Sequence, residues 1–258
     1  PRQKRVDYVN GDVRDLDTLL ETVDSYDVDC ILHLAAMIGV RTDADPHVAT
    51  AVNVLGTSNV FEAARLRSIR RVVFTSSVMR EAGIGLPGSG GAHPGPRNLY
   101  GAHKLVGEFE AAIYRERFGL DVVVVVVAAT LGLGRRGTST ERAPHLTMLA
   151  AADLDGVADV PAAREWSLPL RPVRDVAKII VGAGVDANPG TFVQCGGRQT
   201  SLAELAEALQ RRQPGFAARF TGGAWPGILP VDGSAADATF GIPLRDLDDL
   251  VAIALETT

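Results

Sequence analysis

Short hydrophobic runs alternate along the chain with segments whose apolar residues recur at helical spacing. The clearest run is Val122–Val127, six valines in succession. Branched residues at every position favour a strand that is buried on both faces, as in the centre of a parallel sheet. Further strands are predicted over residues 29–36, 71–77 and 191–195, and a short extended run is predicted over residues 6–9.

Helical patterns separate these runs. Residues 16–23 carry leucines and a valine at helical spacing after Asp15, a favourable N-cap residue. Longer helices are predicted over residues 46–66 and 99–118, and the second is ended by Gly119, which tolerates the positive φ common after a helix. Other helices are predicted over residues 144–152 and 173–183, from Ser201 onward with Glu204 at capping-box spacing, and over residues 246–255, while residues 214–232 are predicted to be loop.

This alternation predicts a doubly wound α/β fold, a Rossmann-type parallel sheet with right-handed crossovers. We place the first domain over residues 1–131. Residues 132–258 are expected to complete the sheet and to add a smaller lobe for the substrate. Because open α/β sheets bind ligands beyond the carboxyl ends of their strands, the cleft is expected between these two parts.

Composition narrows the possible functions. The chain has 258 residues, 46% of them hydrophobic, and a net charge of −5. This mild negative charge argues against a nucleic-acid or anionic-membrane partner, which would favour clustered lysine and arginine. No apolar stretch reaches the ~18–20 residues of a membrane helix, and the start lacks a signal-peptide pattern. A cytoplasmic protein is therefore expected, with Cys30 and Cys195 as reduced core thiols and no metal site.

The clearest candidate chemistry is the sequence Tyr100-Gly-Ala-His-Lys104. Residues four apart share one face of a helix, so the lysine ammonium can favour the phenolate and lower the tyrosine pKa from its usual ~10. Such a phenol can give or take a proton while hydride moves at the adjacent carbon. The spacing alone is a weak signal, since many helices carry it by chance. Thr75, Ser76 and Ser77 strengthen it, because they end a predicted strand where hydroxyls could hold a substrate oxygen.

Together with further motifs in the same order, these segments resemble the extended short-chain dehydrogenase/reductase family, best known for nucleotide-sugar epimerases and dehydratases. Several motifs in one order are far more specific than any single one. The matching segments are residues 11–15, 34–36, 53–57, 75–77, 100–104, 174–177 and 196–205.

The resemblance implies that residues 1–131 form a dinucleotide-binding domain, and it implies a role for each matching residue. Tyr100 would be the general acid/base, Lys104 would tune it and hold the nicotinamide ribose, Ser77 would bind the reacting oxygen, and Asn53 would support the catalytic helix. The residues implied to bind NAD or NADP are Asp12 and Val13 at the adenine, Leu34, Ala35 and Ala36 beside the pyrophosphate, and Thr75, Tyr100 and Lys104.

Substrate contacts and assembly are less well defined by the sequence. Besides Ser77, Met79 and Arg80 could line the substrate mouth, although a solvated turn is an equal alternative there. Arg171 could hold a carboxylate or phosphate.

Two helices per subunit often form a four-helix dimer interface in this family, so a homodimer is expected, with Val60, Phe61, Ala111 and Ala112 as contacts.

The sequence departs from the family pattern at its start. The family opens with a strand, a Gly-x-x-Gly-x-x-Gly turn that receives the pyrophosphate, a helix and a second strand, and none of these is present. Without the first strand, the extended run at residues 6–9 and the strand at 29–36 would each have one edge whose backbone groups are unpaired. Our preferred interpretation is that the printed sequence is incomplete. A domain that has lost its dinucleotide half is the alternative. His103 also departs from the pattern, replacing a frequent serine, and is predicted on the helix surface.

The leading hypothesis is an NAD(P)-dependent enzyme of the epimerase/dehydratase type that moves hydride at a carbinol carbon of a sugar-like substrate. Nucleotide sugars are among the substrates that this hypothesis includes. A net dehydrogenase or reductase of a sugar acid or specialised metabolite is an alternative. A non-catalytic dinucleotide sensor or scaffold is an alternative of another class. The presence of Ser77, Tyr100 and Lys104 argues against the last, because a sensor has no need of a tuned phenol.

Overall fold

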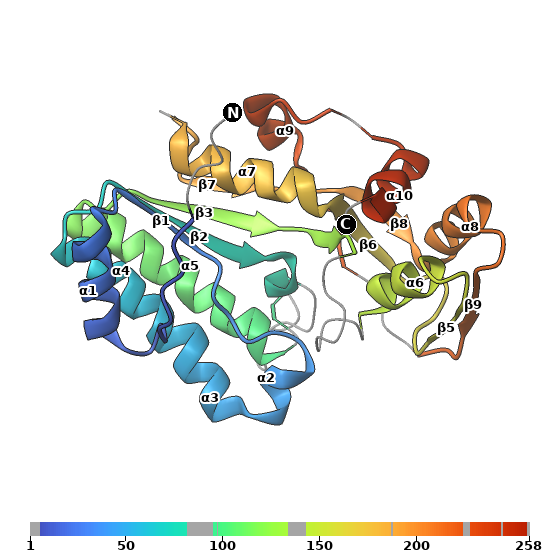
Figure 1. Cartoon of the computed structure of the whole chain (residues 1–258), viewed down its shortest axis with the longest axis horizontal. Helices are drawn as coiled ribbons and strands as arrows, with labels where there is room; N and C mark the ends of the chain where they lie inside the picture. Colours follow the sequence, from blue (N-terminus) through green and yellow to red (C-terminus); the bar gives the residue numbers. More distant parts are fainter. Residues whose placement is uncertain are drawn as a thin grey trace.

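A parallel four-stranded sheet forms the centre of the larger part of the molecule. The structure is a computed structural model of the chain and describes residues 6–81, 95–96, 98–133, 143–186, 188–223, 228–243 and 245–256. The sheet has the order β1-β2-β3-β7 and consists of β1 (Cys30–His33), β2 (Arg71–Ser77), β3 (Val122–Val127) and β7 (Phe192–Gln194). All its strands run in one direction, so their carboxyl ends meet at one edge (Figure 1).

Helices cover both faces of this sheet, as the unbroken valine run predicts. The helices α4 (Gly56–Leu66) and α5 (Leu99–Phe118) lie on one face and α7 (Val173–Val185) lies on the other (Figure 1). Successive strand residues point to opposite faces. Val122, Val124 and Val126 accordingly pack in the core that contains residues of α4 and α5, whereas Val123 and Val125 pack with residues of α7. The doubly wound α/β prediction is confirmed.

Most predicted helices are present with nearly the predicted bounds. The helix α5 spans the predicted residues, and Gly119 ends it with φ of 68°. Asp15 caps α1 (Leu16–Tyr26) by accepting from two backbone N–H groups. The helix predicted over residues 46–66 is composite, because α3 (Pro46–Thr50) and α4 are joined by one wide π-helical turn, η1 (Ala51–Leu55), and α2 (Val40–Ala44) precedes it unpredicted.

The prediction of an extended strand near residues 6–9 is wrong for the described structure. Residues 6–10 belong to no strand, and Val6 and Tyr8 are 68% and 93% exposed. A strand needs a hydrogen-bonded neighbour, and β1 pairs with β2 alone among the described residues. Leu32 and Leu34, at this open edge, are consequently exposed.

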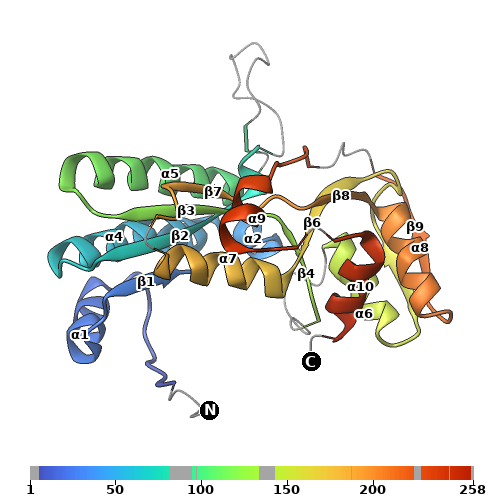
Figure 2. The same cartoon turned by 90° about the horizontal axis from the view of Figure 1, so that it is seen from above.

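The second lobe lies at the end of the sheet where the strands finish (Figure 2). One of its sheets consists of β4 (Ala129–Leu131), β6 (Ser167–Pro172) and β8 (Arg198–Ser201), and the other pairs β5 (Val157–Val160) with β9 (Ala217–Phe220). The segment that contains β9 is predicted to be loop from the sequence. Its short Ala-Ala-Arg-Phe sequence gives too weak a pattern of hydrophobic residues to predict a strand. The lobe's helices are α6 (Pro144–Ala152), α8 (Leu202–Arg212) with the predicted capping box, and α10 (Leu247–Glu256). The helix α9 (Ser234–Phe240) packs beside α7 on the main sheet instead (Figure 1).

Close packing of α5 on β2 requires a glycine. A Cβ on Gly107 would collide with the ring of Phe74, which is 1% exposed and lies 5.9 Å from each of the rings of Phe61 and His33. The surrounding rings leave Phe74 little room to move. The position therefore sets how near α5 can approach the sheet.

Replacing Gly107 with alanine is expected to destabilise the protein by roughly 1–3 kcal/mol through overpacking, despite the better helix propensity of alanine, worth about 1 kcal/mol. Urea unfolding measures this change. Gly156→Ala is the matched control, since a Cβ there meets its nearest neighbour at an ordinary 3.5 Å. An unfolding free energy that rises in Gly107→Ala would contradict the packing argument.

Candidate active site

The predicted proton-transfer pair lies beside the end of β2. Asn98 caps α5 by accepting from the Gly101 N–H at 2.9 Å, so Tyr100 and Lys104 occupy the first two turns of the helix. A Cβ on Gly101 would collide with the Met79 carbonyl, which shows how closely this turn packs on the 3-10 turn η2 (Val78–Glu81) that follows Ser77. The helix start and the strand end thus form one edge.

Lys104 is buried and directed toward both Tyr100 and the sheet. Its side chain is 4% exposed, and its Nζ donates to the Thr75 carbonyl at 2.7 Å. The Nζ atom lies 5.6 Å from the centroid of the Tyr100 ring and 4.9 Å from that of Phe74. Burial lowers the pKa of Lys104 from 10.5 to about 8. The group therefore remains mostly cationic at neutral pH, next to the tyrosine.

Ser77 keeps a hydrogen-bonding proton for a further partner. It ends β2, is 9% exposed, and its Oγ accepts from the Met79 N–H at 3.2 Å. A hydroxyl that accepts one hydrogen bond can still donate its own. Thr75, two residues earlier, donates to the His33 carbonyl at 2.9 Å, which ties β2 to β1 at this edge.

Glu108 belongs to this group of residues and was missed by the sequence reasoning. It accepts from the Ser76 hydroxyl and from Arg80 Nη1, the latter at 3.0 Å. Burial raises the pKa of Glu108, while its charge raises that of Lys104. The signal was available, because Tyr100, Lys104 and Glu108 repeat at intervals of four residues along one helix face.

Arg80, expected at the substrate mouth, has several partners within the protein. Its guanidinium contacts Glu108 and Glu81 and lies 5.2 Å from the ring centroid of Phe192 in β7. The side chain is 14% exposed. Met79, its neighbour, is half-buried in η2. This arrangement fixes the turn after Ser77 against α5 and β7.

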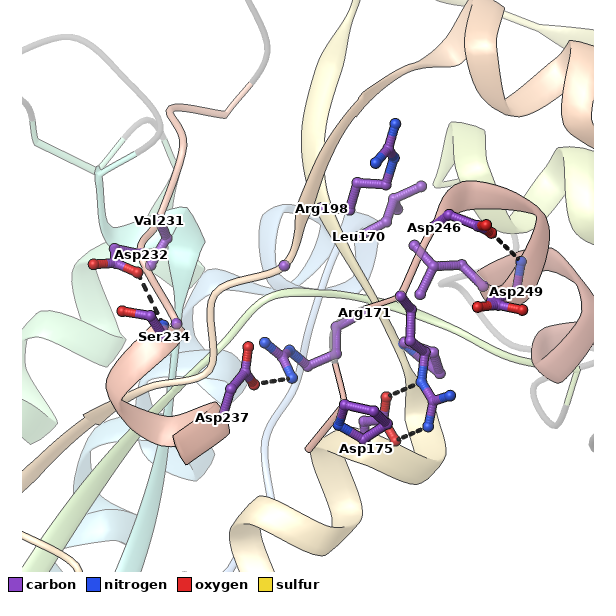
Figure 3. A pocket seen from close by; sticks show the side chains of 16 residues that line it. Leu170, Arg171, Asp175, Arg198, Val231, Asp232, Ser234, Asp237, Asp246 and Asp249 are labelled. Atoms are coloured by element: carbon purple, nitrogen blue, oxygen red, sulfur yellow. Dashed lines mark hydrogen bonds and ion pairs between the residues drawn. The ribbon is translucent and has the colours of Figure 1, made fainter. Parts of the chain in front are cut away.

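Arg171 is not brought together with the other predicted site residues. It lines a different cavity of about 590 Å³, which is bordered by β6, β8, α9 and α10 and has none of Ser77, Tyr100 and Lys104 in its lining (Figure 3). Its guanidinium is buried, donates to Asp237 at 2.7 Å, and also donates to the Gly196 carbonyl at 3.3 Å. Arg171 thus holds α9 to the lobe, and its geometry gives no support to a substrate contact.

Asn53 and His103 form a buried contact behind the predicted pair. Asn53 lies in η1, where the wide π-helical turn interrupts the α-helix, and π turns are frequent at functional sites. Its Nδ2 lies 3.2 Å from the Nδ1 of His103, which is only 6% exposed. The prediction of a surface His103 is wrong, because α3 and η1 pack on this side of α5 and cover the ring.

Val13, one of the two predicted adenine-binding residues, is held by α4. The Val13 carbonyl accepts from Asn59 at 3.0 Å, and a Cβ on Gly56 would lie 2.6 Å from Val13 Cγ2. Asp12 is exposed, and its hydrogen bonds with Arg14 lower its pKa to about 2, so it stays an acceptor at any working pH.

The predicted pyrophosphate residues border the edge on which a dinucleotide would lie. Leu34 and Ala35 are exposed and Ala36 is half-buried in the loop that follows β1. Asn53 holds the end of this loop by accepting from the Met37 N–H and donating to the Met37 carbonyl. An exposed loop, a permanent acceptor at Asp12 and a buried ammonium at Lys104 together fit a dinucleotide along the carboxyl ends of the strands.

Other kinds of site find no support in the described residues. Within the described ranges, no group of three or more histidine, cysteine, aspartate or glutamate side chains could hold a metal ion. Among the helices that the structure describes, none is both long and apolar enough to cross a membrane. Cys30 and Cys195 are both free thiols, and burial raises the pKa of each.

The fold and the edge geometry define a Rossmann-type α/β protein with a tyrosine–lysine pair at the carboxyl ends of its strands. A sequence model of the NAD-dependent epimerase/dehydratase family matches residues 1–189. The chain belongs to this family, and NAD is the cofactor for which the family is named.

Individual relatives agree with this assignment. A UDP-glucose 4-epimerase of Mycolicibacterium smegmatis is 31% identical over 219 residues, which are 80% of this chain and 66% of that protein. The chain spans 66% of the length of this epimerase and 40% of the length of a putative UDP-glucose 4-epimerase from Methanocaldococcus jannaschii.

Solved structures share the fold. An L-threonine dehydrogenase from Cupriavidus necator superposes with a TM-score of 0.80 at 22% identity, covering 100% of this chain and 88% of that one. A UDP-glucose 4-epimerase of Thermus thermophilus in complex with NAD gives a TM-score of 0.79 at 20% identity, covering 98% and 85%.

Replacing Lys104 with methionine is expected to remove a pH-dependent part of the stability. Because the folded protein releases this proton near pH 8 and the unfolded chain near 10.5, the stability of the wild type should rise with pH across that window. The rise is on the order of 3 kcal/mol at full extent. Urea unfolding of both proteins at several pH values measures the difference. Identical pH slopes in the two proteins would show that folding does not lower the pKa of Lys104.

Proposed function

We propose that this chain carries the catalytic residues of an NAD(P)-dependent enzyme of the epimerase/dehydratase type. It would move hydride at a carbinol carbon of a sugar-like substrate. The observation that carries the proposal is the buried Lys104 ammonium beside the Tyr100 ring at the carboxyl edge of a Rossmann-type sheet. Burying a charge is costly, and a functional site is a common reason for retaining one.

Each residue of the pair has a role that its contacts support. Bound NAD would supply the hydride acceptor. Tyr100, as a phenolate whose charge the Lys104 cation stabilises, would take the proton of the substrate hydroxyl and become a neutral phenol while the hydride leaves the carbinol carbon. One Lys104 N–H is directed to the Thr75 carbonyl, which leaves donors for a ribose hydroxyl. Ser77 accepts from the Met79 N–H and keeps its own proton, which it would donate to the reacting oxygen.

A nucleotide sugar is the substrate class that we favour. The relative with the longest overlap given above is a UDP-glucose 4-epimerase. An epimerase returns the hydride it removes, so its cofactor is not consumed, whereas a net dehydrogenase accumulates NADH. The two reactions need the same proton transfer at Tyr100, and the fate of the cofactor separates them.

Replacing Tyr100 with phenylalanine is expected to lower turnover by 10²-fold or more, roughly the contribution of a positioned general acid/base. Turnover is measured with NAD on UDP-glucose, UDP-galactose and a panel of sugar acids, with NADH absorbance recorded in parallel. Tyr114→Phe is the matched control, because Tyr114 lies on the same helix and contacts Glu62 on α4. Unchanged turnover in Tyr100→Phe would rule out the mechanism.

We also propose that two copies of the chain associate through α4 and α5. Of the contacts expected from the sequence, Val60, Phe61 and Ala111 are incorrect, since they are buried within the chain, whereas Ala112 is half-buried. Three exposed apolar residues of α5, Val106, Phe109 and Ile113, are 40%, 71% and 50% exposed. Their spacing of three and four residues places them in one stripe along α5. Leu55 at the end of η1 and Leu66 at the end of α4 are exposed as well.

The double substitution Phe109→Glu and Ile113→Glu is expected to convert a dimer to a monomer, because four carboxylates would face one another across the interface. Light scattering coupled to gel filtration gives the mass of each species. Leu154→Glu serves as the control, since this leucine is 71% exposed but lies in the second lobe. A wild-type protein that is already monomeric, or a double variant that stays dimeric, would refute this interface.

A further inference from the structure

His103 makes two hydrogen bonds although it stands between Tyr100 and Lys104 on a helix. Its Nδ1 lies 3.2 Å from Asn53 Nδ2, and its Nε2 lies 3.2 Å from Thr50 Oγ1. These partners come from η1 and α3, far from α5 in the sequence. The ring therefore connects the catalytic helix with the segment that precedes α4.

The direction of both hydrogen bonds is determined by the partners. Asn53 Oδ1 accepts from the Met37 N–H at 2.7 Å, which fixes the orientation of the amide. Its Nδ2 must then donate to His103, so Nδ1 of the ring is unprotonated. The Thr50 hydroxyl donates to the Pro46 carbonyl at 2.8 Å and accepts from the Nε2–H of His103. The ring is thus neutral, with its proton on Nε2.

A second series of hydrogen bonds reaches Asn53 from Lys104. The lysine donates to the Thr75 carbonyl, and the Thr75 hydroxyl donates to the His33 carbonyl. The His33 ring contacts the Thr57 hydroxyl at 3.0 Å, which itself donates to the Asn53 carbonyl at 2.7 Å. Asn53 is therefore held from its side chain by His103 and from its backbone by Thr57.

We propose that His103 is a positioning residue that, as a neutral imidazole protonated on Nε2, holds Asn53 and through it the Met37 loop against the catalytic helix. The loop that Asn53 holds follows Leu34, Ala35 and Ala36, on the edge where the dinucleotide would lie. The catalytic consequence of this arrangement rests on the proposed function, whereas the state of the ring does not.

The surroundings of the ring favour the neutral form. A second proton on Nδ1 would face the N–H of Asn53, and it would add a cation next to Lys104. Burial first, and the Lys104 charge second, lower the pKa of His103. The partners on η1 and α3 are uncharged, and the charged or titratable side chains Arg41 and Asp43 of α2 and His47 of α3 are exposed.

Nuclear magnetic resonance tests the state of the ring without any need for activity. Long-range ¹H–¹⁵N correlation spectra of the labelled full-length protein distinguish the two tautomers and the charged form, and His103→Asn assigns the signal. We expect a neutral Nε2–H ring at neutral pH. A proton on Nδ1 under these conditions, whether in place of the Nε2 proton or in addition to it, would overturn the proposal.

Two substitutions test the positioning role. His103→Asn places an amide oxygen near the Nδ1 position and can still accept from Asn53, whereas His103→Leu cannot accept at all. We expect kcat to fall about 10-fold or more in the leucine variant, with the substrate KM little changed, and to fall by less than about 3-fold in the asparagine variant. Thermal unfolding of both variants verifies that they are folded.

The outcomes separate the two proposals. Equal losses of kcat in both folded variants would refute the role through Asn53. A wild-type protein without turnover on any substrate would count against the proposed function alone, because the tautomer measurement would still decide the state of His103.

Discussion

The hydrogen bond from the Lys104 ammonium to the Thr75 carbonyl is the interaction on which this site depends. It holds a cation in a nearly dry environment, where a charge interacts more strongly with its neighbours than it would in water. Its position is set by two constraints of the fold, the short distance between α5 and β2 and the N-terminal cap of α5. Glu108, one turn further on, partly offsets the cost of burial by favouring the ammonium.

The helix α5 organises the site because each of its faces contacts a different element. Tyr100 and Lys104 face the end of β2, while Glu108 receives hydrogen bonds from Ser76 and Arg80. His103 faces η1 and α3. A small shift of the helix would therefore disturb the strand end, the turn after it and the Met37 loop together. Such coupling explains why so many polar side chains are buried around a single helix.

The polar side chains of the second lobe are arranged differently from those around α5. Its cavity is bordered by two buried or half-buried ion pairs, Arg171 with Asp237 and Arg245 with Asp175, which join α9 and the approach to α10 to the strand β6 and the start of α7. Both arginines thus have a carboxylate partner within the protein, which is consistent with a structural role for them.

The sequence by itself determined the four strands of the main sheet, most of the helices, the doubly wound fold and the spacing of Tyr100 and Lys104, because these follow from local periodicity and from spacing within one helix. It did not determine the burial of His103, the contacts of Glu108 or the ion pair of Arg171. Whether a helical side chain is solvated or enclosed depends on which distant segment packs against its face, and α3, η1, β2 and α9 come from elsewhere in the chain. The pair could therefore be predicted from the sequence alone, whereas the residues that surround and hold it could be identified only from the tertiary structure.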